Sequence, residues 1–447
     1  MFALAEGAPS QSSGKRPWTE ALLWLSFLGP LFFATYLGSL EIVSWREHVP
    51  VVVFDWELHI PFLAWTIVPY WSIDALYAIA LFLPPSREDL RTLAFRLLTA
   101  QLIATAIFLI APLRLTSVIP ADTGAFAFFY GALGEVITKP FNMAPSLHIA
   151  LLVILWMAYV KYLPRRWHWA VNIWAVLIGA SVMTAFQHHF FDVPTGALLG
   201  LFCIWLWPDA APSPVTQFSP SHDRHCIRLA TLYGVGALLC FAVGTLVWGT
   251  GLWLWWPAVS LAFVSYAYAG GGAATFQKST YGHQSLAVRL LLWPYRLGAL
   301  INSRAWTQAL ESRIEIAANV WLGRIPSQPA SGLSVIDLTA EFIRPAGAGM
   351  WRSVPALDLV TVPPHLLREA AREIEYARTK HPPVLVCCAL GFSRSAAAVA
   401  AWLVATGRAN NGADAVVMIR RARPQIRISA EQLAAIDALR VPEAVHA

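Results

Sequence analysis

Long apolar segments fill most of the first 270 residues and restrict what this chain can fold into. About eight stretches reach the roughly twenty residues needed to cross the hydrocarbon core of a bilayer. They lie near residues 20–40, 60–83, 93–112, 146–163, 168–186, 193–208, 227–247 and 252–270. The chain is 57% hydrophobic and only 13% charged, whereas a soluble domain carries about 25% charged residues. The sequence therefore predicts a multi-pass α-helical membrane domain of about eight spans.

Basic residues are distributed unevenly among the loops between these segments. Lys15 and Arg16 precede the first segment, and the loops after the second, fourth and sixth segments hold further Lys and Arg residues. Because basic loops stay in the cytoplasm, alternating spans predict that both termini are cytoplasmic. We expect an integral membrane protein, of a bacterial inner membrane, with no nucleic-acid partner. The net charge of +6 is then a property of the cytoplasmic loops.

The composition changes after about residue 270. Arg289, Arg296 and Arg304 are mixed with Leu and Trp, which favours a pair of amphipathic helices at the membrane surface; a buried linker is the alternative. Further along, short β-branched segments alternate with helical periodicity, which is typical of a soluble α/β domain. The expected organisation is a cytoplasmic tail over 1–19, a membrane domain over 20–270, a basic interfacial linker over 271–310 and a soluble domain over 311–447.

Two short segments at the predicted outer face carry ionisable residues, which are unfavourable at membrane depth and usually functional. The segment "NMAPSLHIALL" contains Ser146 and His148, and the segment "FQHHFFDVPTGALLG" contains His188 and Asp192. On a helix, His188 and Asp192 would share a face because they are four residues apart. Asp192 could then fix the tautomer of His188, whose other nitrogen could attack phosphorus. His148 could protonate the leaving oxygen.

These segments resemble the type 2 phosphatidic acid phosphatase superfamily. Within it, "PSLH" and "HHFFD" look most like the branch of sphingomyelin synthases and inositol phosphorylceramide synthases, over roughly residues 60–210. The resemblance implies His188 as the nucleophile that forms a phosphohistidine, Asp192 as its orienting residue and His148 as the acid. Ser146 is expected to contact the substrate. The chemistry of this family needs no metal or cofactor.

The usual first motif of that family, a Lys and an Arg-Pro separated by six residues, is absent. Arg114 and Lys139 lie on the predicted outer side and are the candidates to hold the phosphate instead. His189 has no matched role and is interpreted as an interfacial residue. Asp74 is either a helix-packing residue or part of a substrate path. The alternative to catalysis is that all these histidines are interface residues.

A second constellation lies in "VCCALGFSRSAAAVAAWL", which predicts a strand, a loop and a helix. Cys388 and Arg394 have C-x5-R spacing, and Ser395 follows. In such a loop, backbone N–H groups point inward at an anion and lower the pKa of the thiol, while Arg394 can bind two phosphate oxygens. Gly391 permits the loop conformation. Ser395 could assist the sulfur, and Ser393 is a further substrate-binding candidate.

This constellation resembles the cysteine-dependent dual-specificity phosphatases, from "NVWLGRIP" to "RPQIRIS". The family uses a general acid on a loop before the phosphate-binding strand, and Asp358, thirty positions before Cys388, matches that role. Asp337 is the competitor, although a residue at a strand end is more often structural. Cys387 stands where the family nearly always has His, so it could reduce activity or merely substitute. A chance match to C-x5-R is the alternative.

Taken together, the sequence predicts a bifunctional membrane phosphatase. The outer module would hydrolyse or transfer a lipid phosphate ester, and the cytoplasmic module would dephosphorylate a protein or a phospholipid. One alternative is a head-group phosphotransferase fused to a signalling protein phosphatase. The other is a non-catalytic membrane scaffold or phosphate sensor.

Overall fold

The computed structural model describes residues 16–136, 139–329 and 332–439. Lys15 and most of the expected tail lie outside the described residues. Backbone contacts divide the chain into two compact units. Unit 1 extends to Ser213 and includes Val247–Thr250, and unit 2 comprises Pro214–Leu246 and Gly251–Ala447. The expected domain boundary near residue 270 therefore does not coincide with the division of the structure, because the last two apolar segments belong to unit 2.

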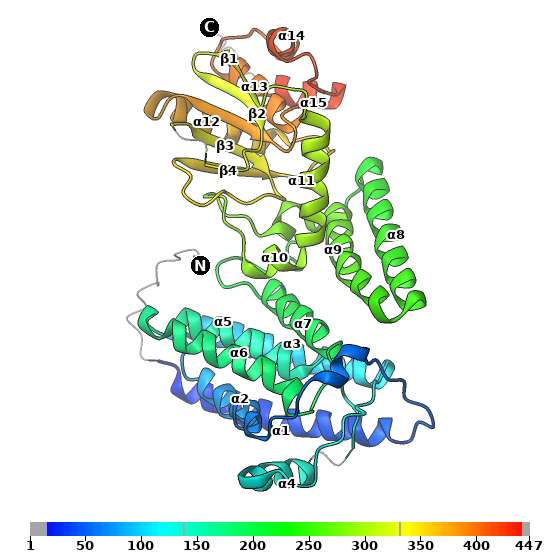
Figure 1. Ribbon diagram of the computed structural model, residues 1–447. Helices are drawn as coiled ribbons and strands as arrows, with labels where there is room; N and C mark the ends of the chain where they lie inside the picture. Colours follow the sequence, from blue (N-terminus) through cyan, green and yellow to red (C-terminus); the bar gives the residue numbers. More distant parts are fainter. Residues whose placement is uncertain (1–15, 137–138, 330–331, 440–447) are drawn as a thin grey trace. The chain divides into compact units, whose positions relative to one another are not determined.

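Unit 1 is helical, with one helix at its centre (Figure 1). This helix, α5 (Leu147–Tyr162), contacts α2, α3, α6 and α7. Its sequence is apolar on all sides, as expected for a helix surrounded by others. The other helices are α1 (Trp18–Val43), α2 (Ile67–Ala80), α3 (Arg87–Ile110), α4 (Ala127–Val136), α6 (His168–Thr184) and α7 (Asp192–Leu206).

Each of the eight predicted apolar segments contains a helix, the last two being α8 (Arg224–Val247) and α9 (Trp255–Tyr266). Among the described residues, α1, α3 and α8 are long and apolar enough to cross a membrane, judged by length and composition. The other five have between 12 and 17 residues. The count of eight spans therefore stays a prediction, while the helical character of these segments is confirmed.

The close approach of α7 to α5 depends on two glycines. A Cβ atom at Gly196 would lie 2.3 Å from the carbonyl oxygen of Ser146, and one at Gly200 would lie 2.7 Å from that of Ala150. Real side chains do not tolerate such distances, so α7 can lie against the beginning of α5 only because these positions lack side chains. This contact also brings the residues before α7 to the N-terminus of α5.

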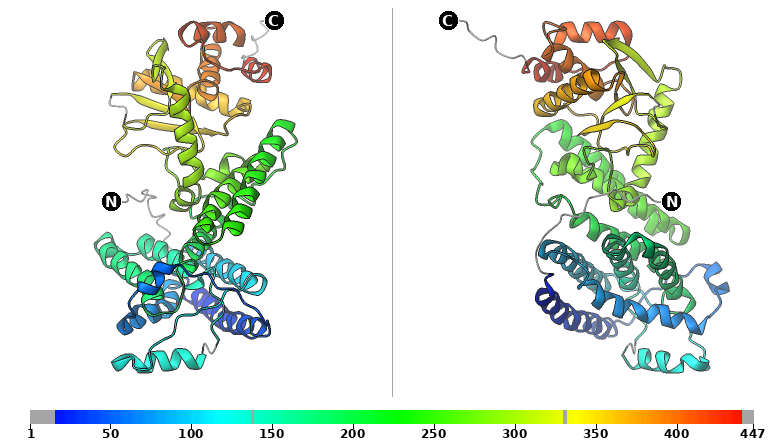
Figure 2. Two further views of the ribbon diagram at one scale, coloured as in Figure 1. Left: turned by 45° about the vertical axis from the view of Figure 1, so that its right-hand side comes forward. Right: turned by 90° about the vertical axis from the view of Figure 1, so that its left-hand side faces the viewer.

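Unit 2 begins with α8 and α9, which lie side by side as a hairpin (Figures 1 and 2). Ser265 on α9 donates a hydrogen bond to the carbonyl oxygen of Ala230 on α8, at 2.7 Å. A π-helical segment (Ala267–Gly271) and a 3-10 segment (Gly272–Phe276) follow, then α10 (Leu286–Leu291) and α11 (Trp293–Thr307). The predicted pair of linker helices is therefore present. Its position at a membrane surface stays a prediction.

The rest of unit 2 is an α/β domain built on a five-stranded sheet in the order β1-β2-β5-β3-β4. The strands are β1 (Arg313–Ala317), β2 (Val320–Arg324), β3 (Ser334–Thr339), β4 (Trp351–Ala356) and β5 (Val384–Cys388). Only β1 is antiparallel to its neighbour. The helices are α12 (Pro364–Lys380), α13 (Arg394–Ala405), α14 (Gly412–Ala422) and α15 (Ala430–Asp437).

Helices cover both faces of this sheet. On one face, α13 is buried along almost its whole length between the strands and α12, with Trp402 fully buried. On the other face, Ala299 and Leu300 of α11 pack against a core that includes Leu385 and Cys387. Strand β5 lies at the centre of the sheet and is buried at every position. Its sequence is therefore apolar throughout, as expected for a strand that is covered on both faces. Helix α11 thus joins the α8–α9 hairpin to the α/β domain.

The glycine contact in unit 1 predicts the effect of a small substitution. Gly196→Ala should lower the free energy of unfolding in detergent by about 1–3 kcal/mol, because the added methyl group must displace α5 from α7. The measurement is chemical or thermal unfolding of the purified chain. Gly179→Ala is the matched control, since its Cβ would meet only Leu152 at 3.7 Å. Equal stability of the two variants would contradict this role of Gly196.

Candidate active sites

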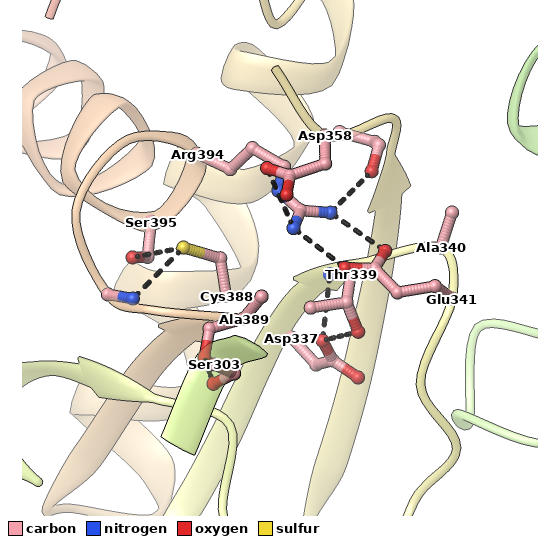
Figure 3. A network of polar contacts seen from close by, with 12 residues as sticks. Ser303, Asp337, Thr339, Ala340, Glu341, Asp358, Cys388, Ala389, Arg394 and Ser395 are labelled. Atoms are coloured by element: carbon pink, nitrogen blue, oxygen red, sulfur yellow. Dashed lines mark hydrogen bonds and ion pairs between the residues drawn. The ribbon is translucent and has the colours of Figure 1, made fainter. Parts of the chain in front are cut away.

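The loop between β5 and α13 surrounds the sulfur of Cys388 (Figure 3). The Sγ atom accepts a hydrogen bond from the backbone N–H of Gly391 at 3.3 Å and from the hydroxyl of Ser395 at 3.2 Å. Gly391 has φ of 77°, and a Cβ there would lie 2.6 Å from the backbone of Gly323. The loop conformation therefore requires glycine, as the sequence predicts. The hydrogen bonds to Sγ stabilise a thiolate.

Arg394 is almost completely buried and is held by two carboxylates (Figure 3). Its two terminal nitrogens donate to both oxygens of Glu341, at 2.7 and 2.9 Å, and Nη2 lies 3.0 Å from Asp358. The Nε atom is buried and has no hydrogen-bond partner among the described residues. This N–H group is thus available to bind a phosphate oxygen. The sequence prediction missed Glu341, which lies 53 positions before Arg394 and matches no local motif.

Asp358 lies beside Arg394 on the loop after β4, which fits the predicted general acid. Burial raises the pKa of Asp358 above its usual value, and the negative charge of Glu341 raises it further, although Arg394 opposes both effects. A raised pKa keeps the carboxyl group protonated toward higher pH. A general acid needs this property in order to give its proton to a leaving oxygen.

Residues from outside the α/β domain hold the Asp358 loop. Tyr268 donates a hydrogen bond from its hydroxyl to the carbonyl oxygen of Asp358, and His225 on α8 donates to that of Leu359, both at 2.9 Å. Leu359 has φ of 60°, a conformation that side-chain-bearing residues rarely adopt. The two hydrogen bonds stabilise this strained backbone. The α8–α9 hairpin therefore helps to position the predicted general acid.

Asp337 has a structural role rather than that of the general acid. It is fully buried within β3, where it accepts hydrogen bonds from the N–H and hydroxyl of Thr339, at 2.8 and 2.7 Å. It also forms a buried ion pair with Lys278. Because Lys278 lies between the 3-10 segment and α10, this pair attaches the linker to the sheet. Both carboxylate oxygens of Asp337 are thus engaged, one by Thr339 and the other by Lys278.

Cys387 lies in the apolar layer between the sheet and α11. Burial raises the pKa of its thiol well above the usual value, and the nearby Asp337 adds to this effect. Cys387 therefore stays a neutral thiol, and only Cys388 is placed for nucleophilic attack.

Arg423 supports the loop from another side, since it donates to the carbonyl oxygen of Leu390 at 3.3 Å and lies over the ring of Phe392.

In unit 1, three predicted residues form one hydrogen-bonded chain. His188 Nδ1 lies 3.2 Å from Asp192 Oδ2, and Ser146 Oγ lies 3.1 Å from His188 Nε2. A carboxylate only accepts hydrogen bonds, so Nδ1 of His188 donates to Asp192 and Nε2 faces the hydroxyl of Ser146. His188 lies in the turn before α7 and not on a helix, which corrects the expectation of a shared helix face. The turn brings the two side chains together instead.

His148 is close to this chain but makes different contacts. Its ring stacks on that of Tyr70 with centroids 4.1 Å apart, and its buried Nε2 has no hydrogen-bond partner among the described residues. A substrate oxygen could therefore bind there, as expected of the predicted acid.

His189 is buried, whereas an interfacial position was expected. It contacts Glu57 at 3.2 Å and the backbone N–H of Thr116 at 3.1 Å.

Glu57 is a second residue that the sequence prediction missed. Its carboxylate also accepts hydrogen bonds from the backbone N–H groups of Phe190 and Phe54, both at 2.9 Å. Burial opposes its ionisation, but these bonds and the one from His189 lower the pKa of Glu57. Glu57 therefore fixes the turn that carries His188. The contact joins residues 132 positions apart, so no local pattern could reveal it.

The other phosphate candidates of unit 1 lie elsewhere. Lys139 forms an ion pair with Glu41 and a 2.8 Å hydrogen bond to Ser44, so its charge is already neutralised. The side chain of Arg114 is exposed. Asp74 is also exposed, on α2. The structure thus brings together Ser146, His188 and Asp192. Lys139 is paired with Glu41 and not with this group.

Comparison with known proteins identifies the α/β domain. Residues 353–439 match the family model described as "Dual specificity phosphatase, catalytic domain". Together with the C-x5-R loop, this shows that the chain is a phosphatase with a cysteine-dependent, dual-specificity catalytic domain. Comparison with curated proteins gives no match. The resemblance of the helical part to lipid phosphatases therefore stays a prediction.

Several solved structures are similar to part of the chain. The crystal structure of PTPMT1 in complex with PI(5)P is 18% identical, with 29% of this chain and 94% of that chain covered and a TM-score of 0.26. Tk-PTP in the active form is 23% identical, with 29% and 95% covered and a TM-score of 0.27. The human tyrosine phosphatase-like serine/threonine/tyrosine-interacting protein is 24% identical, with 28% and 93% covered and a TM-score of 0.25.

The shared contact of Glu341 and Asp358 with Arg394 predicts a shift in pH dependence. Asp358 must be protonated to act as an acid, so activity falls as the pH rises through its pKa. Glu341→Gln removes a charge that raises this pKa. The alkaline limb of the kcat profile should therefore move to lower pH in Glu341→Gln, as measured by phosphate release across pH.

The control for this experiment is Glu373→Gln, which removes a half-exposed carboxylate paired with Arg352. It should leave the alkaline limb in place. Asp358→Asn should abolish the limb and lower kcat by roughly 10²–10⁴-fold. An alkaline limb that does not move in Glu341→Gln would show that Asp358 does not donate the proton.

Proposed function

We propose that this chain is a bifunctional integral membrane phosphatase. Unit 2 hydrolyses a phosphomonoester through a phosphocysteine on Cys388. Unit 1 hydrolyses or transfers a lipid phosphate ester through a phosphohistidine on His188. The observation that carries the second half is the chain from Asp192 through His188 to Ser146, with Nε2 of His188 beside a hydroxyl group.

In the histidine site, Nε2 of His188 attacks phosphorus and forms a P–N bond as the P–O bond to the leaving group breaks. Asp192 stabilises the positive charge on the ring. His148 is the candidate to protonate the leaving oxygen, because its Nε2 has no partner among the described residues. Water or an alcohol then attacks phosphorus, the P–N bond breaks, and the proton of the attacking oxygen goes to His148. Water releases phosphate when phosphorus carries no other ester, whereas an alcohol yields a new phosphodiester when phosphorus still carries a head group. Both outcomes use the same residues.

In the cysteine site, the Cys388 thiolate attacks phosphorus, a P–S bond forms and the P–O bond breaks. The proton of Asp358 goes to the leaving oxygen, and Arg394 with the loop N–H groups binds the phosphate oxygens. Water, deprotonated by Asp358, then attacks phosphorus. The P–S bond breaks, inorganic phosphate leaves and the thiolate is restored. The hydroxyl of Ser395, 3.2 Å from Sγ, stabilises the departing thiolate.

We further propose a bacterial inner membrane location with both termini in the cytoplasm. The positive-inside rule supports this orientation, and a free thiolate survives in the reducing cytoplasm. The histidine site would then lie at the outer face and the cysteine site at the inner face. That arrangement argues against direct transfer of one soluble phosphate between them, and we propose instead that both sites serve one lipid pathway.

A head-group phosphotransferase joined to a signalling phosphatase is the second candidate. It is favoured by "PSLH" and "HHFFD", which resemble sphingomyelin synthases. The two candidates differ in the product of the histidine site, since transfer yields a phosphodiester lipid and hydrolysis yields free phosphate. A non-catalytic scaffold is the third candidate, and turnover by either site would exclude it.

The test is phosphate release and lipid product analysis with the full chain in detergent on a panel of lipid phosphates. His188→Ala should lower one activity by roughly a thousandfold or more and Cys388→Ser a different one, because each removes a nucleophile. His168→Ala, a change at the start of α6, is the control and should leave both activities unchanged. If His188→Ala loses no activity on any lipid, the proposed histidine chemistry is excluded.

A further inference from the structure

A cavity of about 390 Å³ lies beside the phosphate loop of unit 2. Five residues of the α/β domain line it, and two of them, Glu341 and Asp358, belong to the catalytic network. Leu359 follows Asp358, and Ala389 and Leu390 directly follow Cys388 in the loop. This volume is in the range of small-molecule sites. The cavity is therefore placed to hold the part of a substrate next to its phosphate group.

The opposite wall of the cavity comes from helices that precede the α/β domain. Tyr233 of α8, Leu261 of α9 and Ala299 of α11 are among the lining residues. This wall is mainly apolar. Helix α8 is long and apolar enough to cross a membrane. Its exposed large apolar side chains are Ile227, Leu232, Val235, Leu238, Leu239, Phe241, Val243, Leu246 and Val247. The cavity is thus bounded by a helix whose surface suits lipid better than water.

Specific contacts hold this wall in place. The ring of Tyr233 stacks on that of Tyr268, with centroids 5.6 Å apart, and meets the ring of Tyr295 edge-on at 5.9 Å. The backbone N–H of Tyr295 donates to the hydroxyl of Ser260 at 3.2 Å. Ser303 of α11 donates to the carbonyl oxygen of Ala389 in the loop. The cavity is therefore a built feature that joins the helices to the catalytic loop.

The chemistry of the wall decides between two kinds of substrate. A phosphopeptide would bring backbone N–H and C=O groups against apolar side chains, and each group without a partner there is unfavourable. A hydrocarbon chain gives up no hydrogen bonds when it enters the cavity, and it is stabilised by roughly 0.8 kcal/mol for each buried methylene. The wall thus favours a substrate whose phosphate is attached to an apolar body.

We infer that the Cys388 site acts on a lipid phosphomonoester, whose apolar part lies in the cavity between the phosphate loop and helices α8, α9 and α11. This inference rests on the proposed hydrolysis at Cys388 and adds its substrate class. The lipid enters from the bilayer side, along helices that the substrate itself can contact. The hairpin and the π-helical segment after it then serve the catalytic site in two ways, since His225 and Tyr268 also hold the Asp358 loop.

Gly298 of α11 offers a direct test, because a Cβ at this cavity-lining position would meet no atom within 4 Å. A leucine there fits the helix and occupies cavity space. The substrates are hexyl phosphate, decyl phosphate and p-nitrophenyl phosphate, with the full chain in nanodiscs. Gly298→Leu should lower the ratio of kcat/KM for decyl phosphate to that for p-nitrophenyl phosphate by about tenfold. The ratio for hexyl phosphate should fall less.

Two controls separate this effect from others. Longer chains partition into the nanodisc whatever the cavity does, but this contribution is the same for wild type and variant and cancels in the comparison. Gly38→Leu on α1, where a Cβ also meets no atom within 4 Å, should change no ratio. A ratio that Gly298→Leu does not change would overturn the inference, as would a phosphotyrosine peptide that is hydrolysed with higher kcat/KM than decyl phosphate.

The inference and the proposed function can fail separately. If Cys388→Ser still hydrolyses p-nitrophenyl phosphate at the wild-type rate, the proposed chemistry at Cys388 is wrong. Binding of the alkyl phosphates to Cys388→Ser protein, which has lost the nucleophile, then still reports on the cavity. Tighter binding of decyl than of hexyl phosphate that Gly298→Leu weakens supports the inference, and binding independent of Gly298 contradicts it.

Discussion

The buried contact of Arg394 with Glu341 and Asp358 is the interaction on which the cysteine site depends. A guanidinium group without partners is very unfavourable in a protein interior, and removing one partner of such a pair typically costs about 3–5 kcal/mol. Glu341 holds both terminal nitrogens and fixes the plane of the group. Asp358 is thereby kept beside the phosphate loop. One ion-pair network thus sets the phosphate-binding geometry and the environment of the general acid.

The division of the structure into two units assigns the α8–α9 hairpin a role that its composition does not predict. These helices belong with the phosphatase domain and not with the other apolar helices. They contact the Asp358 loop, line the cavity beside Cys388 and connect to the sheet through α11 and Lys278. Apolar helices with several specific polar contacts to a catalytic loop do more than anchor it. We regard them as part of the enzyme.

Local patterns predicted much of this structure. The strand, loop and helix around Cys388, the left-handed Gly391 and the helices α12–α15 follow from short-range periodicity and turn chemistry. Strand β4 contains a proline, which local patterns count against a strand, but β4 lies at the edge of the sheet, where proline is tolerated. Glu341, Glu57 and Tyr268 act on partners 53, 132 and 90 positions away, and no local pattern encodes such contacts. Whether an apolar helix packs on a membrane domain or on a phosphatase is likewise invisible in its composition.

The most direct test of this account locates the phosphate during turnover. The full chain is mixed with p-nitrophenyl phosphate at low pH, where breakdown of the intermediate is slow, then quenched and digested for peptide mass spectrometry. We expect one phosphate on the peptide that contains Cys387 and Cys388, assigned to Cys388 by fragmentation and absent from Cys388→Ser. Phosphate on Cys387, or turnover without any phosphorylated cysteine, would contradict the account.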